Sequence, residues 1–308
     1  MEFALNADQQ LLMSTFDALL ARHQAPPHDQ GYVAYSADLQ RELRDGGFLD
    51  VAAQPDFGLL GAALLVEAAA ACPVGVEAAA SMMIGPLVGE PTGPIALAWK
   101  LGDPVRYLAE AGALCLFEGD DVLVGAMTDE GRTPLDSVAA YPLARLCAAP
   151  SAARRYTGDE AVAIRRRALI GIAAEAAGLM RGALEHTVQY VKDRRQFGQP
   201  LGHFQAIQHR LAEDAQIVQA CKLLAFKAAY EDSDREAAVA ALYAQETMRK
   251  IIYDCHQFAG AMGLTLEFPL HLWTYRLKYL QGEAGGRVAQ SRLLAKTVWE
   301  TDRNSVAA

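Results

Sequence analysis

The stretch YVKDRRQFGQPLGHFQAIQH, residues 190–209, decides how the rest of the chain is interpreted. Helical patterns run up to it and away from it, and FGQPLG in its centre contains two glycines and a proline, which stop a helix. Arg194 stands on one side of this turn and Gln205 on the other. A guanidinium and an amide at such a corner suit an anionic or nucleotide ligand, whereas the alternative is an ordinary solvated corner between two helices.

On both sides of this corner, the pattern of apolar residues, prolines and glycines divides the chain into three parts. Residues 1–90 show helical patterns, residues 91–159 alternate short apolar runs with prolines and glycines, and residues 160–308 return to helical patterns. The apolar runs IALAW, ALCLFEG and DVLVGAM predict strands, and Gly119–Asp121 predicts a hairpin turn. The C-terminal part predicts a four-helix bundle, with helices expected at 165–192, 204–230, 236–259 and 290–301. The sequence therefore predicts a mainly α protein with a small β insert.

Composition limits the kind of protein and its partners. With 308 residues, 52% hydrophobic and 21% charged, the chain is long and apolar enough for two or three compact globular units. A net charge of −9 argues against a nucleic-acid partner, which would favour a basic surface. The start has no basic segment typical of a signal peptide, and no apolar run reaches membrane-span length.

The metal-binding residue types show no metal motif. The five cysteines are far apart and contain no CxxC pair, so neither a zinc site nor a disulfide framework is predicted. The histidines likewise lack ligand spacing. This cysteine usage suits a reducing compartment, and we expect a cytoplasmic protein without a bound metal.

Two motifs around the corner carry a family resemblance. Residues 194–198 read Arg-x-x-Phe-Gly and are followed by the pair Phe204–Gln205, while QFAGAMGLTLEFP at 257–269 resembles a Gln-x-x-Gly-Gly-x-Gly run followed by Glu-aromatic-Pro. Both resemble the C-terminal domain of the acyl-CoA dehydrogenases, flavoproteins that desaturate acyl-CoA thioesters. The resemblance implies an N-terminal helical domain (1–90), a truncated middle β-domain (91–159) and a C-terminal four-helix bundle (160–308).

The resemblance also implies an FAD site that is shared between subunits. In the family, the corner and the second motif of one subunit hold the adenosine-diphosphate half of a neighbour's flavin. Arg194 would offer a fork of donors to the pyrophosphate, and Phe197 a flat apolar wall. The implied cofactor-binding residues are Arg194, Phe197, Gln205, Gln257, Phe258, Ala259, Gly260 and Ala261.

The catalytic base is where the sequence departs from the family. Many members carry this glutamate in Tyr-Glu-Gly-Thr before the last helix, but the matching place here reads YLQGEAGGR and puts Gln281 at that position. An amide cannot take a proton near neutral pH. A shift of register makes Glu283 a candidate, and Glu175, on the helix before the corner, is another. No catalytic residue is therefore assigned from the sequence.

The insert lacks the family's flavin-ring elements, a Thr-Glu-Pro-x-x-Gly-Ser-Asp loop and a Trp-x-Thr-Asn strand. These losses resemble the shortened subunit of heteromeric acyl-CoA dehydrogenases of bacterial steroid side-chain degradation. That resemblance implies a full-length partner subunit, an acyl-CoA substrate, FAD shared across the interface, and an electron-transfer flavoprotein as acceptor. The alternatives are a self-sufficient homo-oligomeric dehydrogenase with Glu283 or Glu175 as base, and a helical scaffold without enzymatic activity.

Overall fold

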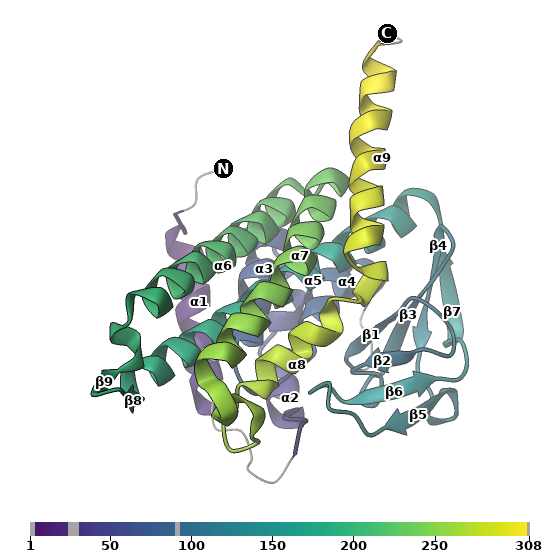
Figure 1. Ribbon diagram of the computed structural model, residues 1–308. Helices are drawn as coiled ribbons and strands as arrows, with labels where there is room; N and C mark the ends of the chain where they lie inside the picture. Colours follow the sequence, from purple (N-terminus) through teal and green to yellow (C-terminus); the bar gives the residue numbers. More distant parts are fainter. Residues whose placement is uncertain (1–3, 24–30, 90–92, 307–308) are drawn as a thin grey trace.

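The computed structural model describes residues 4–23, 31–89 and 93–306, and it is mainly helical with one small β-rich part (Figure 1). This confirms the predicted fold class. The boundary predicted between residues 90 and 91 lies outside the described residues. The helices are α1 (Ala7–Leu20), α2 (Ala37–Asp45), α3 (Gly58–Ala71), α4 (Ala79–Val88), α5 (Gly158–Asp193), α6 (Gln205–Glu231), α7 (Asp234–Ala259), α8 (His271–Leu280) and α9 (Gly286–Val306).

The β insert contains two small sheets. The first has the order β1-β3-β4-β7, with β1 and β3 parallel, and the second has the antiparallel order β2-β6-β5. The strands are β1 (Ile95–Ala98), β2 (Pro104–Arg106), β3 (Ala113–Glu118), β4 (Asp121–Ala126), β5 (Arg132–Leu135), β6 (Leu143–Leu146) and β7 (Ser151–Tyr156). The predicted hairpin turn is confirmed, because Glu118 of β3 pairs with Asp121 of β4.

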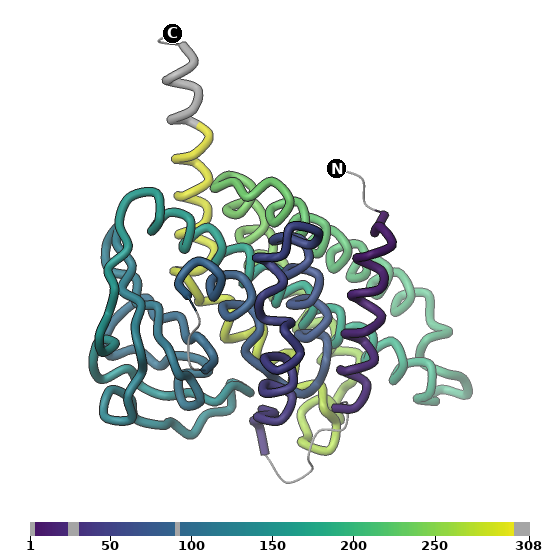
Figure 2. Tube along the Cα trace, turned by 180° about the vertical axis from the view of Figure 1, so that it is seen from behind, coloured from purple at the N-terminus to yellow at the C-terminus, as the bar shows by residue number. Residues whose placement is uncertain are grey.

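Helix α5 is the centre of the molecule. It packs against α3, α4, α6, α7 and α8, and most of its middle section is buried. Figure 2 shows the N-terminal helices lying across one face of the C-terminal helices. This close packing depends on small residues, because a Cβ at Gly178 would collide with the carbonyl oxygen of Glu67, and one at Gly182 would collide with the Trp273 ring. One continuous apolar core therefore joins the N-terminal helices to the bundle.

The C-terminal segment contains one helix more than predicted. The long helices α5, α6 and α7 lie close to their predicted ranges, but the fourth predicted helix is α9, which begins at Gly286, and α8 precedes it. The insert and the α5–α6 corner lie at opposite ends of the molecule, and α9 projects beyond its body (Figure 1). No helix in the described ranges is long and apolar enough to cross a membrane.

Candidate functional site

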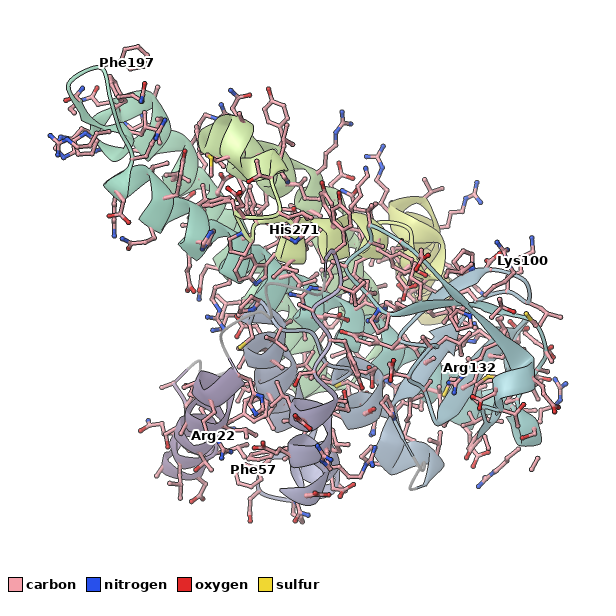
Figure 3. The ribbon with its side chains drawn as sticks, turned by 90° about the horizontal axis from the view of Figure 1, so that it is seen from below. Arg22, Phe57, Lys100, Arg132, Phe197 and His271 are labelled. Atoms are coloured by element: carbon pink, nitrogen blue, oxygen red, sulfur yellow. The ribbon has the colours of Figure 1, made fainter. Side chains whose placement is uncertain are left out.

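The corner between α5 and α6 is a short β-hairpin that projects from the molecule. Strand β8 (Arg195–Gln196) pairs with β9 (Gln199–Pro200), and Phe197 and Gly198 form the turn between them. Both turn residues have positive φ, +54° and +82°, as a type I′ hairpin turn requires. Figure 3 shows Phe197 at one extremity of the molecule, and the residue is 87% exposed. An aromatic ring in a conformation that is rare for bulky residues, and left in solvent, is available for contact outside this chain.

Arg194 and Gln205 stand at the two ends of this hairpin. Arg194 is the residue that ends α5, and its carbonyl accepts a hydrogen bond from the Leu201 N–H at 2.8 Å. Its guanidinium is exposed and has no ion pair or hydrogen bond with any residue that the structure describes. Gln205 is exposed at the first position of α6, where the first N–H groups of a helix lack the usual intrahelical acceptor and carry partial positive charge. An unpaired cation and a helix N-terminus at one corner both favour a phosphate ligand.

The second predicted segment, Gln257–Ala261, lies where α7 ends. Gly260 has a φ of +60°, a conformation that glycine adopts at little cost. Within this segment Ala259 is buried, Phe258 is half-buried, and the other three residues are exposed. Gln257 and Gly260 line a cavity of about 430 Å³ together with Gln281, the residue that follows α8. The exposed groups here are an amide side chain and the backbone of a helix C-terminus, which suit hydroxyl groups better than phosphate.

The structure brings the two predicted segments together through α6. Arg210, five residues after Gln205, forms an ion pair with Asp254 of α7. The same guanidinium lies 4.9 Å from the centre of the Phe258 ring and 5.8 Å from that of Tyr253. The start of α6 and the end of α7 are therefore neighbours, joined by a side chain that the sequence analysis did not identify.

The two carboxylate candidates meet in the interior, far along α5 from the corner. Arg106 of β2 donates from Nη1 to Glu175 Oε2 at 2.7 Å and from Nε to Glu283 Oε2 at 3.1 Å. The side chains of Arg106, Glu175 and Glu283 are only 3%, 6% and 6% exposed. The Tyr141 hydroxyl donates to the second oxygen of Glu175 at 2.9 Å. We call Arg106, Glu175 and Glu283 the buried acidic cluster.

The electrostatics of this cluster are those of a closed structural site. One guanidinium faces two carboxylates, and the rings of Tyr107 and Tyr141 lie 5.7 and 5.5 Å from it. Burial raises the pKa of Glu283, and Glu175 adds to the rise, whereas Arg106 opposes it. Non-glycine residues with positive φ flank the cluster at Tyr107 and Ala284, and such positions persist only where the surroundings enforce them. Both carboxylates are thus paired with the buried guanidinium of Arg106.

Gln281, which the sequence places at the usual base position, does not belong to this cluster. Its side chain accepts a hydrogen bond from Lys278 Nζ at 3.1 Å at the end of α8. It faces the same cavity as Gln257. The structure therefore places the two candidate carboxylates, Glu175 and Glu283, together in the interior and Gln281 apart from them, beside Gln257.

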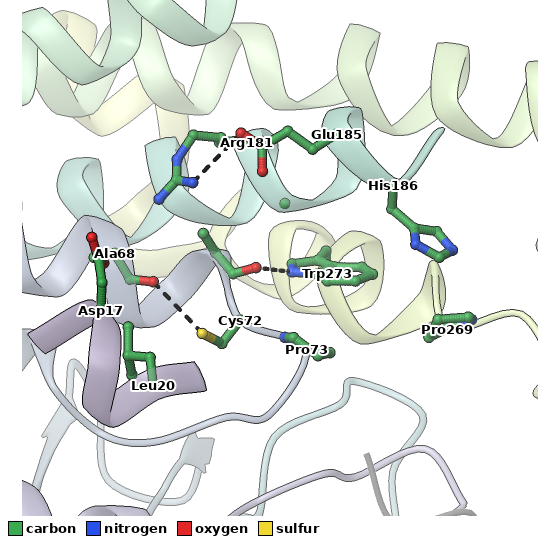
Figure 4. A pocket seen from close by; sticks show the side chains of 12 residues that line it. Asp17, Leu20, Ala68, Cys72, Pro73, Arg181, Glu185, His186, Pro269 and Trp273 are labelled. Atoms are coloured by element: carbon green, nitrogen blue, oxygen red, sulfur yellow. Dashed lines mark hydrogen bonds and ion pairs between the residues drawn. The ribbon is translucent and has the colours of Figure 1, made fainter. Parts of the chain in front are cut away.

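A further cavity of about 500 Å³ lies between α1, α3, α5 and α8 (Figure 4). Arg181 and His186 of α5 face it from one side and Trp273 of α8 from another. Arg181 is already paired with the buried carboxylate of Glu67 at 2.6 Å. Burial lowers the pKa of His186, so its ring is neutral at physiological pH. No residue predicted from the sequence lines this cavity.

The cysteines and histidines give no metal centre in the parts of the chain that the structure describes. Four of the five cysteines are buried as free thiols, and Cys147 is an exposed one. Among the described residues, no three His, Cys, Asp or Glu side chains are grouped to hold a metal ion.

Sequence reasoning missed Arg106 and Arg210, the two arginines that organise these sites. Each pairs with residues distant in the chain, 69 and 177 positions away for Arg106 and 44 for Arg210. The one local signal was an arginine within the short run PVRY, flanked by apolar residues, since a charged side chain in a buried strand needs a partner.

Comparison with known sequences identifies relatives of this chain. The 3-(aryl)acrylate reductase of Clostridium sporogenes is 38% identical over 106 residues, which cover 33% of this chain and 28% of that protein. The acyl-CoA dehydrogenase IpdE2 of Mycolicibacterium smegmatis is 28% identical over 294 residues, 88% of this chain and 93% of that protein. The match to IpdE2 extends over nearly the full length of both chains.

Solved structures share the fold. A chain of the ChsE4-ChsE5 complex from Mycobacterium tuberculosis superposes with a TM-score of 0.81 at 21% identity, covering 97% of this chain and 99% of that chain. A chain of a Tcur3481-Tcur3483 steroid ACAD variant gives a TM-score of 0.78 at 22% identity, covering 96% and 99%. The family model for the acyl-CoA dehydrogenase C-terminal domain matches residues 142–298, more than half of the chain. Together with the two motifs at the corner and at the end of α7, this match shows that the chain belongs to the acyl-CoA dehydrogenase family of oxidoreductases.

Proposed function

We propose that this chain is the FAD-sharing subunit of a heteromeric acyl-CoA dehydrogenase, in which a full-length partner subunit holds the flavin ring and supplies the catalytic base. The observation that carries the proposal is the contrast between the two sites. The corner presents an unpaired Arg194 and an exposed Phe197, whereas Glu175 and Glu283 are buried on Arg106. The chain is thus equipped to contact a ligand held by another subunit.

The residues at the corner fit the adenosine-diphosphate half of FAD. Arg194 and the N-terminus of α6 would hold the pyrophosphate, because both supply donors and positive charge. Phe197 would pack against the nucleotide, and Gln205 would hydrogen-bond to it. The end of α7, with Gln257 and the segment up to Ala261, would contact the ribose hydroxyls through its amide and free carbonyl groups.

The reaction we propose for the complex is α,β-desaturation of an acyl-CoA thioester. Bound FAD supplies the hydride acceptor for this reaction, and an electron-transfer flavoprotein would reoxidise the complex. This chain contributes by holding the adenosine-diphosphate end of the cofactor. The heteromeric and steroid-related structures that share the fold support a bulky, steroid-type acyl group as the substrate class.

The test is flavin retention in the complex formed by this chain and a full-length acyl-CoA dehydrogenase subunit. Arg194→Ala removes a charge-assisted contact worth about 1.5–3 kcal/mol, so the complex should bind FAD roughly 10- to 100-fold more weakly. Arg195→Ala is the matched control, because it changes the adjacent exposed arginine of β8 and should leave FAD affinity unchanged. FAD binding that is equal in both variants and in the wild type would favour the scaffold alternative and reject the proposal.

A further inference from the structure

Four charged side chains form a network between α6 and α7. Lys250 of α7 contacts Asp214 of α6 at 2.6 Å and Asp254 of α7 at 2.8 Å, and Asp254 also pairs with Arg210 of α6. The side chains of Asp214 and Asp254 are 0% and 2% exposed, whereas the two cations reach the surface. The network is thus a pair of buried carboxylates bridged and covered by two cations.

The network lies directly beside the segments that we assign to the nucleotide. On α6, Arg210 is five residues beyond Gln205, and on α7, Asp254 is four residues before Phe258, one helical turn. Arg210 links the two helices, since its guanidinium bonds to Asp254 and lies 4.9 Å from the centre of the Phe258 ring. A change at Arg210 would therefore reach both segments at once.

Helix packing alone does not require this arrangement. Elsewhere along α6 and α7 the buried residues are mostly small or apolar, such as Ala225 and Ala229 on α6 and Ala241 and Ala244 on α7. Small apolar contacts tolerate sliding and rotation of one helix on another, whereas a buried ion network has one arrangement that satisfies its charges. The charged contact sits at the end of the helix pair where the spacing of the two segments matters for a bound ligand.

We propose that Arg210 is a positioning residue of the nucleotide site, which holds the start of α6 at a fixed distance and angle from the end of α7 through Asp254 and the Phe258 ring. This inference rests on the proposed function, because it concerns the same FAD half-site. In this role Arg210 does not touch the cofactor. It keeps Gln205 and Gln257 placed so that one ligand contacts both.

The test compares two arginines with similar structural roles. Arg181 pairs with the buried carboxylate of Glu67, which also contacts Lys222, so it reproduces the arginine–lysine–carboxylate arrangement away from the nucleotide segments. In the purified complex, Arg210→Met should raise the dissociation constant of FAD roughly tenfold, whereas Arg181→Met should leave it unchanged. Both variants should lower the melting temperature, so the FAD readout separates positioning from general loss of stability.

A conservative variant provides the rescue. Arg210→Lys keeps the ion pair with Asp254 and should retain FAD affinity within about threefold of the wild type. If Arg210→Met fails to assemble with the partner, Arg210→Gln replaces it in the comparison. Wild-type FAD affinity in the Met or Gln variant, or an equal loss in Arg181→Met, would overturn the inference.

The Arg194→Ala variant distinguishes this failure from failure of the proposed function. Loss of FAD in Arg194→Ala with full retention in Arg210→Met would leave the half-site in place and remove only the positioning role. Full retention in Arg194→Ala would instead remove the half-site itself, and with it the basis of this inference.

Discussion

Arg106 and Arg194 are two arginines of one chain in opposite situations. Arg106 is 3% exposed and binds two carboxylates, so its charge is neutralised within the molecule. Arg194 is exposed on a projecting corner and has no partner among the described residues. A buried, satisfied ion cluster contributes to the choice of one structure, whereas an exposed, unpaired cation beside an exposed aromatic ring is available for a ligand.

The contrast is the basis of our proposal that this chain serves in a complex whose catalytic base comes from the partner subunit. Glu175 and Glu283 are the two candidates for the catalytic base from the sequence. A catalytic base must reach the proton that it removes. Here each carboxylate is held by Arg106, and Tyr141 occupies a further oxygen of Glu175. In our proposal, this chain therefore contributes through Arg194 and Phe197 at its outer corner.

The largest expected effect comes from breaking the buried acidic cluster. Arg106→Met leaves two carboxylates buried without their cation, and such a loss typically costs about 3–5 kcal/mol. Urea denaturation of the variant should show a correspondingly lower free energy of unfolding. The control is Arg287→Met, which removes an ion pair to Glu246 with side chains that are 63% and 55% exposed and should leave the free energy of unfolding nearly unchanged.

A triple variant sharpens this prediction. Adding Glu175→Gln and Glu283→Gln to Arg106→Met removes the uncompensated charges, so part of the lost stability should return. If Arg106→Met were no more destabilising than Arg287→Met, the cluster would not be a closed structural site, and Glu175 or Glu283 would regain interest as a base.

A smaller effect concerns pH and Asp214. Burial raises the pKa of Asp214 from its ordinary value of 3.8 to about 6, with Lys250 opposing the rise and Asp254 adding to it. Because the folded state then holds this proton more tightly than the unfolded state, its contribution to stability is complete below pH 3.8 and is lost as pH rises through 6.

Asp214→Asn should remove this pH-dependent contribution. Between about pH 4 and 7, the free energy of unfolding of the wild type relative to the variant should fall by on the order of 1–3 kcal/mol. Lys250, Asp254 and Glu213, the charged groups around Asp214, are retained in the variant. Parallel pH profiles for the two proteins, measured by denaturation at each pH, would contradict the assignment.

The smallest effect on stability is expected at the corner itself. Phe197 is 87% exposed with positive φ, so Phe197→Gly removes little packing and relieves an unfavourable backbone conformation. The free energy of unfolding of the isolated chain should change by no more than about 1 kcal/mol, while FAD retention in the complex should decrease. A large loss of stability in the isolated chain would show that the ring belongs to this chain's own core.

The long helices and the corner could be predicted because their signals are local. The helical period runs through α5, α6 and α7, and Gly198 and Pro200 mark the break between α5 and α6. The short strands β2 and β5 escaped prediction because three or four residues, each run including a proline, carry no alternation. The sequence analysis assigned no element between residues 259 and 290, where the structure has α8, a short turn that places Glu283 against Arg106, and the start of α9 at Gly286.

The contacts that define the sites could not be predicted in the same way. The buried acidic cluster joins β2, α5 and the turn before α9, and its formation depends on how the insert packs on the bundle. The network of Arg210, Asp214, Lys250 and Asp254 likewise depends on the rotation of α6 against α7. From the sequence alone, charged residues at such positions are expected to lie on the solvated surface. Only the tertiary structure shows that they are paired in the interior.

Sharing of FAD between two subunits is tested most directly by the flavin content of this chain, purified alone and in complex with the full-length partner subunit that we propose. Absorbance of released FAD against protein concentration gives the stoichiometry in each case. We expect no FAD on the isolated chain and one FAD for each pair of chains in the complex. FAD retained by the isolated chain, together with reduction of a dye by an acyl-CoA, would contradict this expectation.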